Sequence, residues 1–74
     1  MTTSTSVLLS LTVNGQPAEV PSGSTVSDLL ASLDTAGKRV AVERNGEIVP
    51  RSRHAATALA AGDRLEIVIA VGGG

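Results

Sequence analysis

The chain has 74 residues, no Cys, no aromatic residue and a formal net charge of −1. A domain this short buries only about 60% of its unfolded surface, so its core must be aliphatic and well packed. The chain has neither a basic footprint nor aromatic rings for stacking, which argues against a nucleic-acid partner. No apolar run is long enough for a membrane span, and no secretory leader is evident. We therefore expect a cytoplasmic protein, in keeping with the absence of Cys.

The first part of the chain predicts a β-hairpin. Residues 1–6 are rich in Ser and Thr, and we expect them to be flexible. Residues 7–13 alternate between apolar and polar side chains, which predicts a strand. Asn14-Gly15 follows directly and is a strong signal for a tight hairpin turn. Residues 18–20 lie between two prolines and are expected to return as an edge strand, because Pro cannot donate to a sheet ladder.

A short helix is predicted over residues 26–32. Thr25 and Asp28 have the spacing of a capping box, in which each side chain bonds the backbone N–H of the other residue. Apolar side chains then recur at the spacing of one helical face, at Val26, Leu29, Leu30 and Leu33. Lys38 and Arg39 are expected in the loop that follows the helix.

The second half predicts three more strands. Residues 40–43 and 48–49 are expected to be two short strands, separated by another Asn-Gly turn. The segment 51–61 is polar and then Ala-rich, and it has room for one helical turn with Leu59 as its anchor. Residues 65–71 alternate again and predict the last strand. Its Leu and Ile side chains share one face, and Glu66, Val68 and Ala70 share the other.

This order of elements predicts an α+β fold of the β-grasp, or ubiquitin-like, type. A hairpin followed by a helix that returns to the same sheet makes a right-handed crossover. The last strand is the most apolar, so we place it in the centre beside the first strand and parallel to it. The helix would cover one face of a mixed sheet of four to five strands. The domain would then span residues 7–71, and residues 72–74 would form a flexible glycine tail.

The chain offers few groups for catalysis, and we predict neither a catalytic residue nor a metal site. His54 lies in a polar segment and is expected to be a solvated surface residue. Ser24 and Ser52 have no base nearby in the sequence, and Ser24 or Thr25 fits a helix cap. Asp63 and Glu66 lie in or beside a turn and are expected to be solvated. Both Asn-Gly turns lack the glycine spacing and the following helix of a phosphate-binding loop.

The most informative feature is the end of the chain, Gly72-Gly73-Gly74. Glycine lacks Cβ, so this tail can approach another backbone closely and enter a narrow active site. A carboxylate becomes a good electrophile once it is joined to AMP. A persulfide sulfur can then displace AMP and leave a thiocarboxylate. A Gly-rich end also arises by chance or from cloning, and it is the combination with a β-grasp element order that favours the carrier interpretation.

Several short stretches together carry a resemblance to a known family. They are Val13 to Gly15, Thr25 to Leu30, Val40 to Arg51, Gly62 to Val68 and Val71 to Gly74. In this order and at this length, the chain resembles the ThiS-type sulfur carriers of thiamin biosynthesis over nearly its whole length. One departure concerns Ser52-Arg53-His54, where the family often has an aromatic residue. This leaves the partner contacts of that loop open.

The resemblance implies a definite cycle with no cofactor bound to the chain itself. An E1-like, ATP-dependent adenylyltransferase (ThiF) would activate the carboxylate of Gly74, and Gly73 would complete the diglycine. A cysteine desulfurase or a related donor would supply the sulfur, and thiazole synthase (ThiG) would accept it. Exposed apolar residues near the tail, Val68 and Ala70, suggest a docking surface. Scattered exposed valines are also ordinary on protein surfaces, so both interpretations stay open.

Three other functions share some of these features. The small subunit of molybdopterin synthase has the same fold and chemistry, but residues 43–51 and the triple glycine favour the thiazole carrier. A ubiquitin-like modifier would form isopeptide bonds through Gly74, although Lys38 is the single lysine on which chains could be built. A plain interaction module with an inert tail would keep working after deletion of Gly74.

Overall fold

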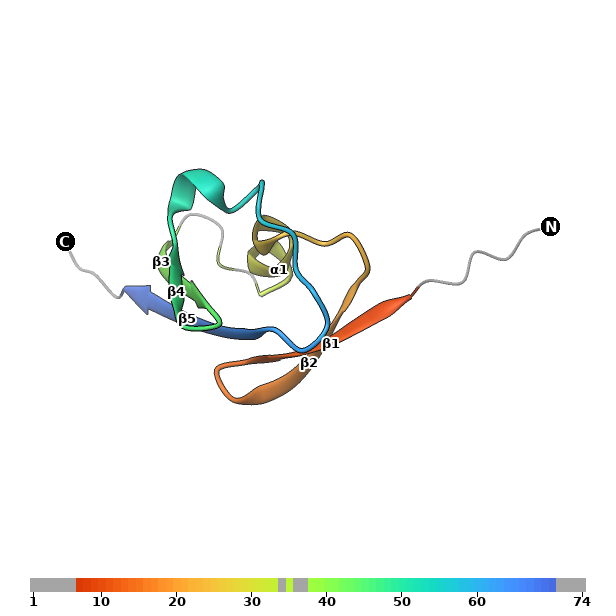
Figure 1. Cartoon of the computed structure of the whole chain (residues 1–74). Helices are drawn as coiled ribbons and strands as arrows, with labels where there is room; N and C mark the ends of the chain where they lie inside the picture. The colour runs from red at the N-terminus through yellow and green to blue at the C-terminus, as the bar shows by residue number, and fades with distance from the viewer. Residues whose placement is uncertain (1–6, 34, 36–37, 71–74) are drawn as a thin grey trace.

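The computed structural model describes residues 7–33, 35 and 38–70, which form a mixed β-sheet with one α-helix on one of its faces (Figure 1). The elements in chain order are β1 (Leu8–Val13), β2 (Gln16–Pro21), α1 (Val26–Ser32), β3 (Arg39–Arg44), β4 (Glu47–Val49), the 3₁₀ turn η1 (Arg51–Arg53) and β5 (Arg64–Ala70). The order agrees with the prediction, and the helical turn expected within residues 51–61 is η1.

The sheet has five strands in the order β2-β1-β5-β3-β4. The last strand, β5, occupies the centre, parallel to β1 on one side and antiparallel to β3 on the other. This arrangement is the predicted β-grasp topology. The central position suits β5 because its inward side chains Leu65 and Ile67 are only 1% and 7% exposed.

Both hairpins turn through an Asn-Gly pair. In the first turn φ is 52° at Asn14 and 81° at Gly15, and in the second it is 53° at Asn45 and 86° at Gly46. Positive φ at both central residues matches the right-handed twist of the flanking strands, which is why Asn and Gly are preferred there. The two sequence signals therefore predicted both the place and the geometry of these turns.

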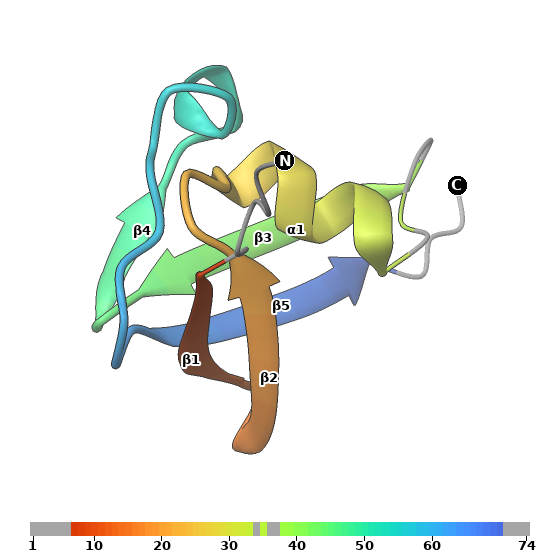
Figure 2. The same cartoon turned by 90° about the vertical axis from the view of Figure 1, so that its right-hand side faces the viewer.

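The helix α1 lies across the sheet and closes the aliphatic core (Figure 2). At its start, Thr25 N–H donates to Asp28 Oδ2 at 2.9 Å and Asp28 N–H donates to Thr25 Oγ1 at 3.2 Å, so the predicted capping box is formed. The helix has only seven residues, and burial of one face therefore contributes more to its stability than helix propensity does. The buried apolar residues are Leu11, Val20, Val26, Leu29, Leu30, Val42, Leu59, Leu65 and Ile67.

Some element boundaries differ from the predicted ones. Strand β2 extends beyond residues 18–20 and includes Pro17 and Pro21. It tolerates both prolines because it is an edge strand that pairs only with β1. Arg39 was expected in a loop, but it is the first residue of β3 and pairs with Ala70 of β5. Pairing with β5 thus makes β3 one residue longer at its start than predicted.

Within the described part of the chain, no helix is long and apolar enough to cross a membrane.

Candidate functional site

The candidate site is the end of β5, from which the chain continues toward the predicted tail. Gly72, Gly73 and Gly74 lie outside the described residues, so their functional assignment stays a prediction. Two neighbouring strands hold β5 over different lengths. Its pairing with β3 runs from Leu65 to Ala70, whereas its pairing with β1 covers only Arg64 and Leu65. The last part of β5 therefore extends past the end of β1.

The side chain of Asn14 continues the sheet ladder where β1 ends. Asn14 N–H donates to Leu65 O at 2.8 Å, as a strand residue would. Its side-chain amide then donates from Nδ2 to Ile67 O at 3.1 Å and accepts at Oδ1 from Ile67 N–H at 2.7 Å. One side chain thus replaces the backbone partner that Ile67 would have in a longer β1. We call this pair of side-chain bonds the Asn14 clamp.

A second turn asparagine holds the start of β5 from the opposite side. Asn45 N–H donates to Arg64 O at 2.8 Å, and Asn45 Oδ1 accepts from Arg64 N–H at 2.8 Å. The Asn45 Nδ2 amide also donates to Asp63 Oδ1 at 3.0 Å. The sequence predicts both asparagines as turn residues only. Side-chain roles like these depend on which strand lies next to the turn, and the local sequence does not show that.

The two predicted docking residues lie on the sheet face opposite the helix. Val68 is 62% exposed, and Ala70 is also exposed. Val68 pairs with Ala41 of β3, which is exposed on the same face, and Ile48 of the neighbouring β4 is 67% exposed. We call Ala41, Ile48, Val68 and Ala70 the outer patch. Their exposure makes them available to a partner, while docking itself stays a prediction.

Ile69 departs from the expected division of faces. It alternates with the buried Leu65 and Ile67, yet it is 42% exposed. The described core ends at Ile67, so the next inward position of β5 lies at the rim of the domain. The apolar surface at the end of β5 therefore includes positions on both faces of the sheet.

Asp63 was expected to be solvated, and this expectation was wrong. It is only 5% exposed and accepts three hydrogen bonds, from Arg44 Nε at 2.7 Å, Asn45 Nδ2 at 3.0 Å and Ala60 N–H at 2.8 Å. Burial acts to raise the pKa of Asp63, but the bonds from Arg44, Asn45 and Ala60 outweigh it and hold the pKa below its usual value of 3.8. Asp63 thus fixes the turn that leads into β5, while Glu66 is exposed as expected.

His54 was expected to be a solvated surface residue, and this was also wrong. It is 6% exposed, and its Nε2 atom lies 3.0 Å from Val49 O. The backbone carbonyl of His54 accepts from Ser27 N–H at 3.0 Å, so the segment after η1 is tied to the start of α1. His54 thus contacts β4 through its ring and the helix through its backbone carbonyl, in a sequence context that looks polar throughout.

The remaining polar candidates are structural or exposed. Ser24 Oγ donates to Pro21 O at 2.6 Å in a buried position, and the helix cap itself is Thr25. Ser52 is exposed within η1. Among residues 7–33, 35 and 38–70, no group of three His, Cys, Asp or Glu side chains could hold a metal ion. The polar candidates among the described residues therefore give no second site, and the candidate site is β5 with the segment that follows it.

Comparison with known proteins connects this architecture to one family. The sequence model of the ThiS family matches residues 11–74. The crystal structure of the thiamine biosynthesis protein ThiS from Geobacter metallireducens aligns with a TM-score of 0.75 at 39% identity, over 89% of this chain and 100% of that chain. The sulfur carrier protein ThiS of Bacillus subtilis is 48% identical over 50 residues, which are 68% of this chain and 76% of that protein.

Two longer proteins contain a segment similar to this chain. A thiazole synthase of Paramagnetospirillum magneticum is 46% identical over 66 residues, which cover 89% of this chain and 20% of the synthase. A thiazole synthase of Magnetococcus marinus is 40% identical over 62 residues, which cover 84% of this chain and 19% of the synthase. The chain thus spans about a fifth of the length of these two relatives. Because the family match covers most of the residues and the fold agrees, the chain belongs to the ThiS family.

Proposed function

We propose that the chain is a sulfur carrier of thiamin biosynthesis, acting as a co-substrate of other enzymes and not as an enzyme itself. The observation that carries this proposal is the ThiS family match, which runs to Gly74 and includes all three glycines. The described part of the fold also supports the proposal. The central strand β5 pairs with β3 as far as Ala70 and leads toward this segment. The reactive group would be the carboxylate of Gly74, with Gly72 and Gly73 as its access route.

In the proposed cycle, a ThiF-like adenylyltransferase uses ATP to join the Gly74 carboxylate to AMP and releases pyrophosphate. The sulfur of a persulfide, supplied by a cysteine desulfurase or a related donor, attacks the acyl carbon and AMP leaves. A thiol then attacks the donor's sulfur in the resulting acyl disulfide, which releases the thiocarboxylate and leaves the donor in a disulfide with that thiol. A second thiol reduces this disulfide and frees the donor thiol. The chain binds no cofactor in this cycle, because ATP belongs to the activating enzyme. We place the cycle in the cytoplasm, with no nucleic acid or membrane as a partner.

A ThiG-like thiazole synthase is the proposed acceptor of the sulfur. Two thiazole synthases contain a segment similar to this chain, which supports a physical association between the two activities. A carrier linked to its acceptor would act at a high effective concentration, so linkage is an advantage for a pair that must meet in each cycle. The same reasoning gives no support to molybdopterin synthase as the acceptor.

The outer patch is the proposed docking surface for the enzyme that receives the tail. Val68 is 62% exposed and lies two residues before Ala70, at the end of β5. Exposed apolar side chains beside a reactive segment fit a small partner interface, since contiguous exposed apolar patches mark sites of protein interaction. An enzyme that bound this patch would hold the following segment at a fixed distance from its own active site.

Intact mass spectrometry of the protein isolated from its own host tests the proposed chemistry. We expect a fraction of the protein to carry the mass increase of one oxygen replaced by sulfur, confined to the C-terminal peptide. The protein lacking Gly74 is the control and should show no such increase. If the wild-type protein shows only its unmodified mass in cells grown without thiamin, the sulfur-carrier function is wrong. Co-purification with thiazole synthase or with the large subunit of molybdopterin synthase would separate the two pathways.

A further inference from the structure

The last part of β5 has a neighbouring strand on one side only, within the described residues. Strand β3 pairs with β5 as far as Ala70, whereas the pairing with β1 ends at Leu65. The arrow of β5 therefore runs on beyond the hairpin of β1 and β2 in both views of the fold (Figure 1, Figure 2). A central strand thus becomes an edge strand before it ends.

The backbone of Ile69 points to the side that β1 leaves open. Successive residues of a strand direct their N–H and C=O groups to opposite neighbours. Leu65 O accepts from Asn14 N–H, and Ile67 bonds the Asn14 side chain, so both residues face the β1 side. Ile69 faces the same side, and the described residues offer no hydrogen-bond partner to its N–H or its C=O. We call these two groups the open edge.

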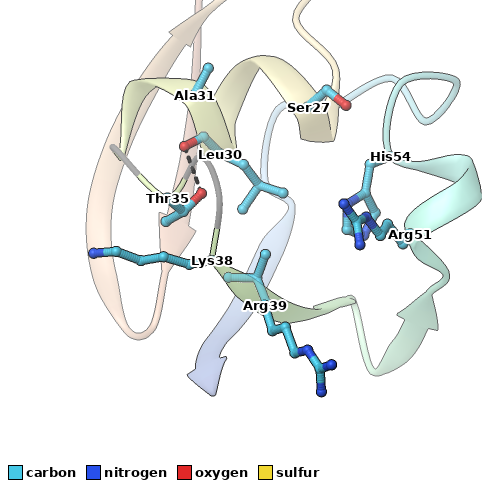
Figure 3. A pocket seen from close by; sticks show the side chains of 9 residues that line it. Ser27, Leu30, Ala31, Thr35, Lys38, Arg39, Arg51 and His54 are labelled. Atoms are coloured by element: carbon cyan, nitrogen blue, oxygen red, sulfur yellow. Dashed lines mark hydrogen bonds between the residues drawn. The ribbon is translucent and has the colours of Figure 1, made fainter. Parts of the chain in front are cut away.

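The described part of the connection between α1 and β3 is tied to the helix. Thr35 is buried, and its Oγ1 donates to Leu30 O at 2.9 Å in the last turn of α1 (Figure 3). The chain then enters β3 at Arg39, on the side of β5 that faces away from β1. Ile69 remains 42% exposed at the end of the strand.

The two outer edges of the sheet are protected in ways that the open edge is not. Exposed strand edges attract other strands, and they are usually blunted by Pro, by charge or by short length. In β2, Pro17, Glu19 and Pro21 face away from β1, so two of the three outward positions have no N–H and the third is charged. Strand β4 has three residues and is followed by Pro50. Ile69 is uncharged, and the sequence after it contains no proline.

We propose that the open edge binds an extended segment of the enzyme that activates the tail, as an added strand beside β5. The identity of this partner rests on the proposed function, whereas the mode of contact rests on the sheet. The added strand would exchange backbone hydrogen bonds with Ile69, as in other cases of strand addition. It would also place an apolar side chain opposite that of Ile69, because residues opposite each other in a sheet share a face.

The Asn14 clamp sets where this pairing begins. Its two bonds already occupy the N–H and C=O of Ile67, so the added strand would start at Ile69 and proceed toward Gly74. The outer patch lies on one face of the sheet, whereas the open edge lies beside the strand. An enzyme that used both would fix the direction of β5 as well as its distance.

Amide hydrogen exchange followed by NMR tests the open edge in the chain alone. We expect the Ile69 amide to exchange much faster than those of Ile67 and Val68, which face the Asn14 side chain and β3. A slow Ile69 amide in dilute protein would show that the chain covers its own edge. Protection that grows with protein concentration would show pairing with a second copy. Either result would overturn the proposal.

The same measurement with the adenylyltransferase of the same organism, in the absence of ATP, tests the added strand. At saturating enzyme we expect exchange of the Ile69 amide to slow at least about tenfold. The Glu19 amide is the internal control, because it points outward from the edge strand β2 and should keep its rate. An Ile69 amide that stays fast, or equal slowing at both positions, would contradict the proposal.

Replacing one amide N–H by an ester oxygen tests the bond itself. The test variant has an ester between Val68 and Ile69, and the matched control has one between Ala18 and Glu19; both are made by chemical synthesis. Each ester removes one outward N–H, keeps all side chains and weakens a carbonyl in a residue that pairs with a neighbouring strand. In pyrophosphate exchange we expect the test variant to raise KM about fivefold with kcat nearly unchanged, and the control to keep the wild-type KM.

The outcomes separate this inference from the proposed function. Equal KM values for the two esters would overturn the added strand and leave the adenylation of Gly74 intact. Both esters should also unfold at similar urea concentrations, and a larger loss of stability in the test variant would contradict an open edge. A wild-type chain that was never adenylated would refute the proposed function and, with it, the partner assigned to this edge.

Discussion

Replacing Asn14 by Gly isolates the Asn14 clamp from the turn that contains it. Gly adopts positive φ readily, so the hairpin and the bond from the residue 14 N–H to Leu65 O are retained. The variant loses the two side-chain bonds to Ile67, at 2.7 and 3.1 Å. At about 1 kcal/mol for each bond, we expect the free energy of unfolding to fall by about 2 kcal/mol. This corresponds to a loss of about 10 °C in Tm for a domain of this size.

The matched control is Asn45→Gly, which removes two comparable bonds from the start of β5. They are Arg64 N–H to Asn45 Oδ1 at 2.8 Å and Asn45 Nδ2 to Asp63 Oδ1 at 3.0 Å. Global stability should fall by a similar amount in both variants. Amide hydrogen exchange tells them apart, because the Ile67 amide should lose protection only in Asn14→Gly and the Arg64 amide only in Asn45→Gly. An Ile67 amide that stays as protected in Asn14→Gly as in the control would refute the clamp.

The remaining predictions concern the buried carboxylate, the helix cap and the outer patch. Asp63→Ala should lower the free energy of unfolding by about 3 kcal/mol in urea titrations, since it leaves three donors without their acceptor. The folded-state pKa of Asp63 is lowered, so its stabilisation is present above pH 3.8 and is lost as the pH falls through the folded pKa; urea titrations of wild type should show this loss, and Asp63→Ala should lack it. Thr25→Ala should cost about 1 kcal/mol in the same assay. Val68→Asp should leave Tm unchanged but slow adenylation, and unchanged adenylation kinetics would exclude a docking role for this residue.

The sequence predicts the fold of this chain well because its signals are local. Alternation in β1 and β5 and the two Asn-Gly turns depend on neighbouring residues only, and each indicates its element without knowledge of the rest. The central place of β5 followed from its apolar composition, and the structure confirms it. Boundaries were less predictable. Arg39 joins β3 because a long β5 lies beside it, and this contact is between residues far apart in the chain.

The polar residues were harder to predict because their burial depends on distant partners. His54 follows three polar residues, yet its ring lies under the domain surface next to the Val49 carbonyl. Asp63 looks like an ordinary turn residue, and its bonds with Arg44 and Asn45, nineteen and eighteen positions away, help to explain its burial. Sequence spacing alone does not bring these segments together.

The way β5 is held bears on how a carrier presents its end to a partner. Asn45 fixes Arg64, Asn14 fixes Leu65 and Ile67, and β3 pairs with the strand as far as Ala70. Ordering one residue costs about 1–2 kcal/mol of backbone entropy, so each residue that the sheet already holds is one that a partner need not order. If the Gly74 carboxylate is the reactive group, as we propose, a strand held through its last residue leaves more of the partner's binding energy for placing that carboxylate. The side chains of Asn14 and Asn45 bond the central strand and not their own hairpins, so they contribute directly to holding it in place.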